Sequence, residues 1–245
     1  VRIRQGVKPL IGNHTGGSRS TAGAGSACKL AALKLIEQAR SLAAERLEVE
    51  PSQVEYAAGV FHTRGSKRKI GLHELAKAGA INVMAEGTFG STFPNGCHIT
   101  EVEIDPATGA SRIVAYNAVD DCGNVINHAV VEGQVHGAVT QGAGQIFSEQ
   151  VVYDRETGQL LTGSFMDYCM PRAGLVPDIR MQDHPLPSVS NALGVKGVGE
   201  SGCTASIPSL ANAVVDALRP LGVAHLDMPM TPAKLWHAIQ TAKNR

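Results

Sequence analysis

Glu200 is a carboxylate in an unusual local setting, the string KGVGESG at residues 196–202. Surface loops use Asp and Asn more readily than Glu, and the glycines at positions 197, 199 and 202 let a backbone pack closely around a bound group. A glutamate held in this way and partly shielded from water can act as a general base. The same side chain could instead cap the first turn of the helix that follows, and spacing alone leaves both interpretations open.

A segment rich in glycine and hydroxyl groups is a second candidate site. It comprises five consecutive residues before a predicted helix: Gly16, Gly17, Ser18, Arg19 and Ser20. Their backbone N–H groups, hydroxyls and guanidinium could converge on one anion, and the start of the helix would add partial positive charge. The GxxxxGK[ST] pattern of a nucleotide-binding P-loop is absent. A flexible loop would explain the same string, so an anion cradle is one of two interpretations.

Gln141 is the third candidate, on a helix predicted over residues 127–146. Its amide offers a donor pair and an acceptor to a polar heterocycle or an oxo group. Glycines recur along the same helix at positions 133, 137, 142 and 144, and each costs about 1 kcal/mol relative to Ala. They indicate close approach by a ligand or by another backbone. A solvent-facing glutamine and tight packing between two protein elements are the alternatives.

The composition excludes several classes of protein. The chain has 245 residues, of which 43% are hydrophobic and 18% charged, so disorder is excluded as its main state. No apolar run approaches the roughly 20 residues of a membrane-spanning helix. Lysine and arginine gather at residues 64–69 without interleaved aromatic side chains, which argues against a nucleic-acid partner.

The five cysteines and nine histidines do not form a metal site by their spacing. No CxxC pair occurs, so neither a structural zinc site nor a cysteine-ligated iron–sulfur cluster is predicted. The histidines lack the spacing of metal ligands as well. We therefore expect no protein ligand to a metal, and reduced thiols in a cytoplasmic protein.

The predicted elements that must position these residues mix strands and helices. Strands are expected at residues 1–4, 54–62, 99–105, 111–120, 150–153, 159–162 and 178–183. Helices are expected at residues 26–47, 73–78, 127–146, 204–218 and 232–243. The segments 12–25 and 193–202 are expected to be loops. Since strands and helices do not alternate regularly, the predicted fold class is α+β, with mixed sheets and packed helices.

Four strings in a fixed order carry a resemblance to a known family. They are HTGGSRSTAGAGSA (14–27), TEVEIDPATG (100–109), EGQVHGAVTQGAGQ (132–145) and GVKGVGESG (194–202). In this order they resemble the molybdenum-cofactor-binding large subunit of the molybdenum hydroxylases. This family includes xanthine dehydrogenase, aldehyde oxidoreductases, carbon monoxide dehydrogenase and the N-heterocycle dehydrogenases. The resemblance covers nearly all of the chain and implies a fold of the molybdenum-cofactor-binding domain type.

The resemblance also implies a cofactor and roles for the candidate residues. The cofactor is molybdopterin, often a dinucleotide such as the cytosine form, and its dithiolene holds the metal in place of protein ligands. Gly16, Gly17, Ser18, Arg19 and Ser20 would line the pterin and its phosphate. Gln141 and Gly199 would contact the cofactor, and Glu200 would be the base. The reaction inserts water-derived oxygen into a C–H bond of an aldehyde or N-heterocycle, and two electrons pass from molybdenum to iron–sulfur clusters.

The molybdenum subunit of this family is much longer than the present chain. Residues 1–245 are therefore expected to be its C-terminal molybdopterin-binding part, which could form two intertwined α+β lobes. Its partners would be the upstream part of the subunit, an iron–sulfur subunit, a flavin subunit with FAD, and a small-molecule substrate. Alone, the chain is expected to be inactive. The alternatives are a structural or assembly module without cofactor, and a component of a molybdenum-dependent aromatic acyl-CoA reductase.

Overall fold

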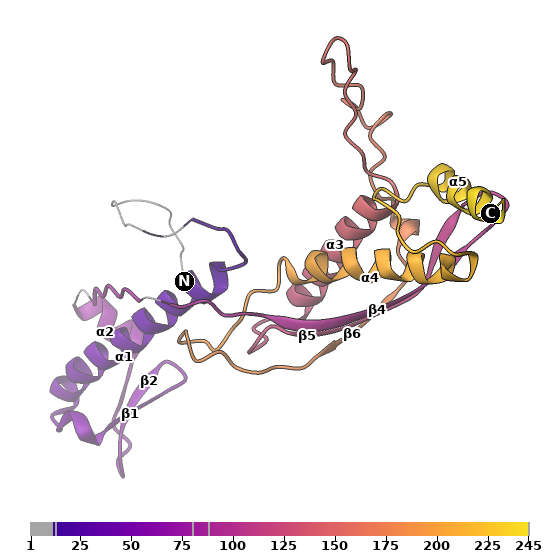
Figure 1. The fold of residues 1–245 in the computed structure, drawn as a ribbon. Helices are drawn as coiled ribbons and strands as arrows, with labels where there is room; N and C mark the ends of the chain where they lie inside the picture. Colours follow the sequence, from indigo (N-terminus) through magenta and orange to yellow (C-terminus); the bar gives the residue numbers. More distant parts are fainter. Residues whose placement is uncertain (1–11, 13, 80, 88, 245) are drawn as a thin grey trace. The chain divides into compact units, whose positions relative to one another are not determined.

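A computed structural model of the chain describes residues 12, 14–79, 81–87 and 89–244 (Figure 1). These residues form two compact units, and the segments of the two units alternate along the chain. Unit 1 contains the described residues of 12–15, 20–91 and 189–194. Unit 2 contains residues 16–19, 92–188 and the described residues from 195 onward. The strand expected at residues 1–4 lies outside the described residues.

Unit 1 combines a long helix with a small antiparallel sheet. Helix α1 (Ser26–Leu47) carries alanines on the side that is buried in the unit. The sheet has the order β1 (Val54–Ala57), β2 (Val60–Thr63) and β3 (Lys69–Gly71), and helix α2 (Leu72–Ala78) follows directly. The core of the unit consists of small and branched apolar side chains and an aromatic ring: Ala39, Ala43, Ala44, Val54, Leu75 and Phe61.

The single strand expected over residues 54–62 is wrong, because two strands form a hairpin there. Ala58 and Gly59 both have positive φ, 49° and 83°, as in the two-residue turns that match the twist of a hairpin. Such turns usually carry Asn-Gly or Asp-Gly, so this pair gave no clear turn signal in the sequence. The basic residues that gather at 64–69 lie where β2 is connected to β3, and Lys69 is the first residue of β3.

The loop expected over residues 12–25 is also wrong at its end. A π-helical turn, η1 (Thr21–Gly25), runs directly into α1. An added Cβ at Gly23 would lie 2.8 Å from the ring of Phe89. One at Gly25 would lie 2.8 Å from Leu193. These glycines therefore serve close packing inside unit 1, which a helix allows as readily as a loop.

Unit 2 is built on a three-stranded sheet. β4 (Asn95–Ile104) and β5 (Ser111–Asp121) pair in antiparallel fashion, and β6 (Ile179–Asp183) joins β5 in parallel. Helices α3 (His128–Phe147) and α4 (Ser201–Leu218) lie together on one face of this sheet (Figure 1). Apolar side chains of strands and helices meet in one core, which includes Ile113, Tyr116, Val135, Val139, Ile146, Leu210 and Val214.

The helices of unit 2 begin where nearby residues satisfy their first backbone groups. The side chain of Asn127 accepts a hydrogen bond from a backbone N–H in the first turn of α3. Thr231 caps helix α5 (Pro232–Lys243) in the same way, and the predicted bounds of α5 are confirmed. Helix α4 begins at Ser201, three residues before the predicted start. Pro208 consequently lies inside the helix rather than near its first turn.

The hairpin expected at residues 150–162 is present without regular strands. A single bridge pairs Tyr153 with Leu160, and Asp154 holds the turn by accepting hydrogen bonds from Thr157. Figure 1 shows this segment leaving the end of α3. Several of its apolar side chains are exposed, namely Val151, Tyr153, Leu160 and Leu161. Turns rather than a core thus hold this segment.

The remaining helical segments are short. The described residues include the 3₁₀ turns η2 (Pro51–Gln53), η3 (Ala173–Leu175) and η4 (Arg219–Leu221). In the part of the chain that the structure describes, no helix is both long and apolar enough to cross a membrane.

Candidate functional site

Ser18 and Glu200, which come from two different predicted site segments, meet in unit 2. The hydroxyl of Ser18 donates a hydrogen bond to Oε2 of Glu200 over 2.9 Å, across 182 residues of sequence. Ser18 has a φ of 54° and follows Gly17 with a φ of 59°. A left-handed conformation is uncommon for a residue other than glycine, and such strain persists where the surrounding structure over-determines it. The two segments therefore meet, and together they form one candidate site.

Glycine at positions 197 and 199 permits this contact. An added Cβ at Gly197 would lie 2.6 Å from both the Cβ and the backbone oxygen of Ser18. One at Gly199 would lie 3.2 Å from the Ser18 hydroxyl and 3.7 Å from Nε2 of Gln134. The close backbone approach that the KGVGESG string predicted is thus present, and the segment that approaches is the turn at Ser18.

Glu200 stands at the start of α4, with its side chain directed to Ser18 and not to the helix. Its backbone oxygen accepts hydrogen bonds from the N–H and the hydroxyl of Thr204, and its side chain makes no capping hydrogen bond. The capping alternative is therefore wrong. The carboxylate is exposed in this chain, beside the partial positive charge of a helix N-terminus.

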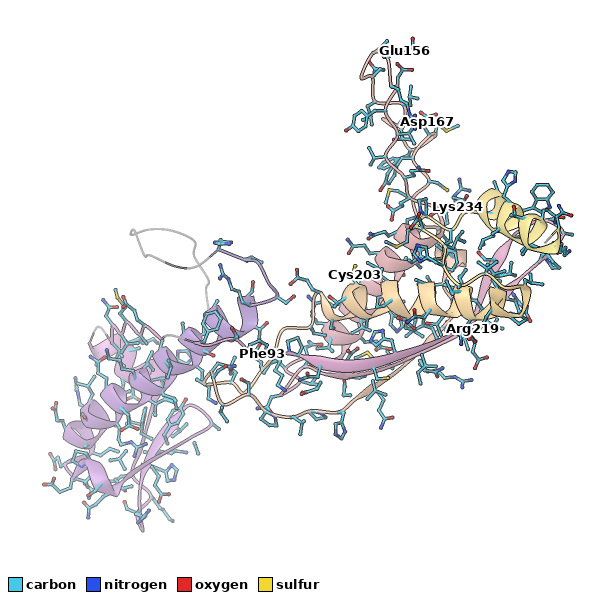
Figure 2. The ribbon with its side chains drawn as sticks, in the orientation of Figure 1. Phe93, Glu156, Asp167, Cys203, Arg219 and Lys234 are labelled. Atoms are coloured by element: carbon cyan, nitrogen blue, oxygen red, sulfur yellow. The ribbon has the colours of Figure 1, made fainter. Side chains whose placement is uncertain are left out.

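Cys203, labelled in Figure 2, lies in the first turn of α4. Burial raises the pKa of its thiol, and the negative charge of Glu200 raises it further. This thiol therefore stays protonated near neutral pH and is no rival to the carboxylate as a base.

Gln134 was not among the predicted site residues, but on α3 it is this glutamine, and not the predicted Gln141, that lies beside Gly199. Its amide is the group near Gly199, whereas Gln141 lies two helical turns further along α3. The residue after Gln141, Gly142, packs against Ser206 of α4. The sequence did contain a signal, because glutamines seven residues apart share one face of a helix.

The other residues of the predicted anion cradle divide between the two units. Gly16, Gly17 and Arg19 lie in unit 2 with Ser18. Ser20 begins the first helical turn of unit 1, and its hydroxyl donates a hydrogen bond to Thr15 over 3.0 Å. The described contacts thus join Ser18, Gly199 and Glu200, with Gln134 beside them, and they leave Ser20 and Gln141 outside this group.

The loop that carries Glu200 is tied to the rest of unit 2 by contacts that no motif indicated. Lys196 donates its backbone N–H to the oxygen of Cys122 over 2.7 Å. Its ammonium forms a short ion pair with the carboxylate of Asp121. The hydroxyl of Thr92 accepts a hydrogen bond from the N–H of Gly197 over 3.3 Å. Partners 75 and 105 residues apart leave no spacing pattern in a sequence.

Asp121 is a fully partnered carboxylate at the end of β5. Burial works to raise its pKa, but hydrogen bonds from Lys196 and from the backbone N–H groups of Leu186 and Gly123 outweigh it and hold the pKa below its ordinary value. The carboxylate therefore stays ionised at neutral pH.

The donors at the site suit a polar organic group better than a bare metal ion. Among the described residues, no three His, Cys, Asp or Glu side chains come together in a way that could hold a metal. A hydroxyl, an amide, a carboxylate and glycine backbone are present instead. A metal bound here would have to arrive with its own ligands, as a pterin dithiolene provides.

Comparison with known proteins identifies the family. A family model described as the molybdopterin cofactor-binding domain matches residues 1–177. The chain belongs to this family. Gly16 to Ser20 and Gln141 lie inside the matched residues of the molybdopterin cofactor-binding domain, whereas Glu200 lies beyond them. The predicted resemblance to the cofactor-binding subunit of molybdenum hydroxylases is thereby confirmed.

Relatives and solved structures agree with this assignment. The chain is 36% identical to the carbon monoxide dehydrogenase large chain of Hydrogenophaga pseudoflava, over 92% of this chain and 30% of that protein. It matches a Cu,Mo-CO dehydrogenase structure with a TM-score of 0.84 and 32% identity, over 96% of this chain and 31% of that one. For quinoline 2-oxidoreductase from Pseudomonas putida 86 the TM-score is 0.81 at 32% identity, over 92% and 30%. The predicted α+β fold class is confirmed, and the chain spans about a third of the length of these relatives.

Proposed function

We propose that the chain supplies the general base and part of the cofactor cradle of a molybdenum hydroxylase. Such an enzyme inserts water-derived oxygen into a C–H bond of an aldehyde or N-heterocycle and passes two electrons from molybdenum to iron–sulfur clusters. The observation that carries the proposal is the hydrogen bond from Ser18 to Glu200. This hydrogen bond joins the glycine-rich segment at residues 16–20 to Glu200, the carboxylate of the KGVGESG string.

Glu200 is the residue that accepts a proton in this proposal. When bound, the cofactor supplies a molybdenum that accepts two electrons and activates water for transfer of oxygen to the substrate carbon. Because the hydroxyl of Ser18 occupies Oε2, the other carboxylate oxygen, Oε1, is the one presented to a proton. A base that is held in place by a hydrogen bond loses less freedom when the proton is transferred.

The cradle uses donors that the backbone brings together without side-chain bulk. Gly16, Gly17, Ser18 and Arg19 would line the pterin and its phosphate, with Gly199 and Gln134 beside them. Gln141 and Ser20 would contact other parts of the cofactor, for which we propose the cytosine dinucleotide form. Iron–sulfur clusters and FAD would lie on partner subunits or domains, in the cytoplasm, where the free cysteines of this chain stay reduced.

The test is Glu200→Gln in the full molybdenum subunit, assembled with its partners and loaded with cofactor. Quinoline, benzaldehyde and carbon monoxide are offered with an artificial electron acceptor, and molybdenum is counted by mass spectrometry. We expect turnover per molybdenum to collapse while the metal content stays near that of the wild type. Glu103→Gln is the matched control, because Glu103 is exposed and its carboxylate pairs with Arg112 at the surface.

Two outcomes would replace the proposal. A complex without molybdenum would favour the structural or assembly module. A loaded complex that needs an electron donor and reduces an aromatic acyl-CoA would favour the reductase. Near-normal turnover of Glu200→Gln would remove the base assignment alone.

A further inference from the structure

Lys196 is a nearly buried cation for which the proposed chemistry has no use. Its side chain is 11% exposed and that of Asp121 is 6% exposed. Taking two charges out of water is unfavourable, and a buried ion pair is weak evidence for stability as such. The pair therefore calls for a role in fixing one arrangement of the chain.

The surroundings of Asp121 make a cation necessary there. Burial raises the pKa of the neighbouring Cys122 thiol. The negative charges of three nearby carboxylates raise this pKa further, namely those of Asp183, Asp121 and Asp120. Lys196 balances Asp121 within this acidic cluster. Removal of the ammonium alone would leave a buried carboxylate without its counter-charge.

The position of Lys196 in the chain connects the pair to the site. It lies four residues before Glu200, in a loop whose glycines supply no side chains to anchor it. Gly197, the next residue, is the surface against which the backbone of Ser18 packs. A shift of Lys196 would therefore move both ends of the hydrogen bond between Ser18 and Glu200.

Asp121 is a firm anchor because it ends a paired strand. Its other carboxylate oxygen accepts hydrogen bonds from the N–H groups of Gly123 and Leu186, each over 2.9 Å. The backbone of Lys196 is also joined to Cys122, the residue after Asp121. The loop is thus fixed to the end of β5 by one main-chain and one side-chain contact.

We propose that the Lys196–Asp121 ion pair is a positioning element that sets the place of the Glu200 carboxylate relative to Ser18. Neither residue touches the reacting atoms in this role. The inference rests on the proposed function of Glu200 as the base. It assigns to the lysine of the GVKGVGE string a task that is separate from holding the cofactor.

The test compares Lys196→Met with Lys196→Arg in the assembled, cofactor-loaded complex. Lys196→Met should lower kcat per bound molybdenum about 10- to 100-fold, as expected for a misplaced base, with KM within about twofold of the wild type. Lys196→Arg keeps the charge and should restore most of kcat. Lys234→Met is the matched control, because Lys234 lies on α5, where its ammonium donates a hydrogen bond to the backbone oxygen of Asp227.

A second readout follows the loop itself and needs no substrate. Hydrogen–deuterium exchange should speed up at residues 197–201 in Lys196→Met and return toward the wild-type rate in Lys196→Arg. The double variant Asp121→Asn/Lys196→Met leaves no unpaired buried charge, so it should fold even if the single variant does not. In our account it still has a low kcat and fast exchange.

The outcomes separate this inference from the proposed function. Wild-type kcat per molybdenum in the single or the double variant would overturn the positioning role, whatever Glu200 does. A parallel loss of molybdenum and activity, with kcat per molybdenum unchanged, would show a merely structural pair and would also overturn it. Full turnover of Glu200→Gln would instead remove the base assignment on which the inference rests.

Discussion

Helix α3 has two halves that use glycine in opposite ways. In the second half an added Cβ at Gly142 would overlap the side chain of Ser206 on α4. In the first half, Cβ atoms added at Gly133 and Gly137 would meet no atom of the described residues within 4 Å. A mid-helix glycine has a similar intrinsic cost at every position. Packing of α3 on α4 therefore accounts for Gly142 but not for Gly133 and Gly137. We expect the cofactor or another part of the subunit to account for these two glycines.

Gly202→Ala should have the largest effect on stability, because it adds a methyl group on α4 against the buried face of α3 and not against the face that carries Gly133 and Gly137. The new Cβ would lie 2.8 Å from the backbone oxygen of Val135 and 2.9 Å from the Cβ of Ala138. Since neither atom can give way without moving α3 against α4, we expect a loss of roughly 1–3 kcal/mol in the free energy of unfolding. Urea denaturation followed by circular dichroism measures it, and an unchanged midpoint would contradict the packed interface.

Gly133→Ala should act in the opposite direction on stability. An alanine on the open side meets nothing in the chain and removes the cost of glycine in a helix, so we expect a gain of about 0.5–1 kcal/mol. The same methyl group should lower the molybdenum content of the assembled enzyme, as measured by mass spectrometry. A variant that is both more stable and normally loaded would mean that the open face simply meets solvent.

Acid should produce the smallest of these effects, at the anchor of the Glu200 loop. The folded pKa of Asp121 is lowered against burial by its hydrogen bonds, foremost that from Lys196. Its contribution to stability is therefore complete above the unfolded pKa of about 3.9 and is lost as pH falls through the lower folded pKa. In Lys196→Met the main source of this lowering is gone, so the acid transition should begin at a higher pH. The measurement is unfolding between pH 6 and pH 2, a range that brackets the ordinary pKa of Asp by about two units. Coincident acid transitions of the wild type and Lys196→Met would contradict this prediction.

The sequence predicted those parts of unit 2 that local patterns determine. Alternation predicted β4 and β5 within a few residues, and the predicted bounds of α3 and α5 agree with the structure to within one residue at each end. The hairpin at Ala58-Gly59 was missed because its turn lacks the usual Asn or Asp. The glycines in η1 were interpreted as a loop. Their packing partners, Phe89 and Leu193, are distant in sequence, so the close packing that explains these glycines could not be predicted.

The site was predictable only in part for the same reason. Ser18, Gly199 and Glu200 were named from motifs, and the structure joins them. The contact between Lys196 and Asp121 depends on how β5 meets the loop before α4, which no local pattern encodes. Which of the two glutamines, Gln134 or Gln141, lies near Gly199 likewise depends on which part of α3 the start of α4 packs against.

The most direct test of the account is turnover per bound molybdenum in Glu200→Gln, measured beside Glu103→Gln in the fully assembled enzyme. Loss of a general base predicts a fall of about 10²- to 10⁴-fold with metal content unchanged, and the control should match the wild type. Turnover of Glu200→Gln within a fewfold of the control would contradict the central claim that this carboxylate is the base.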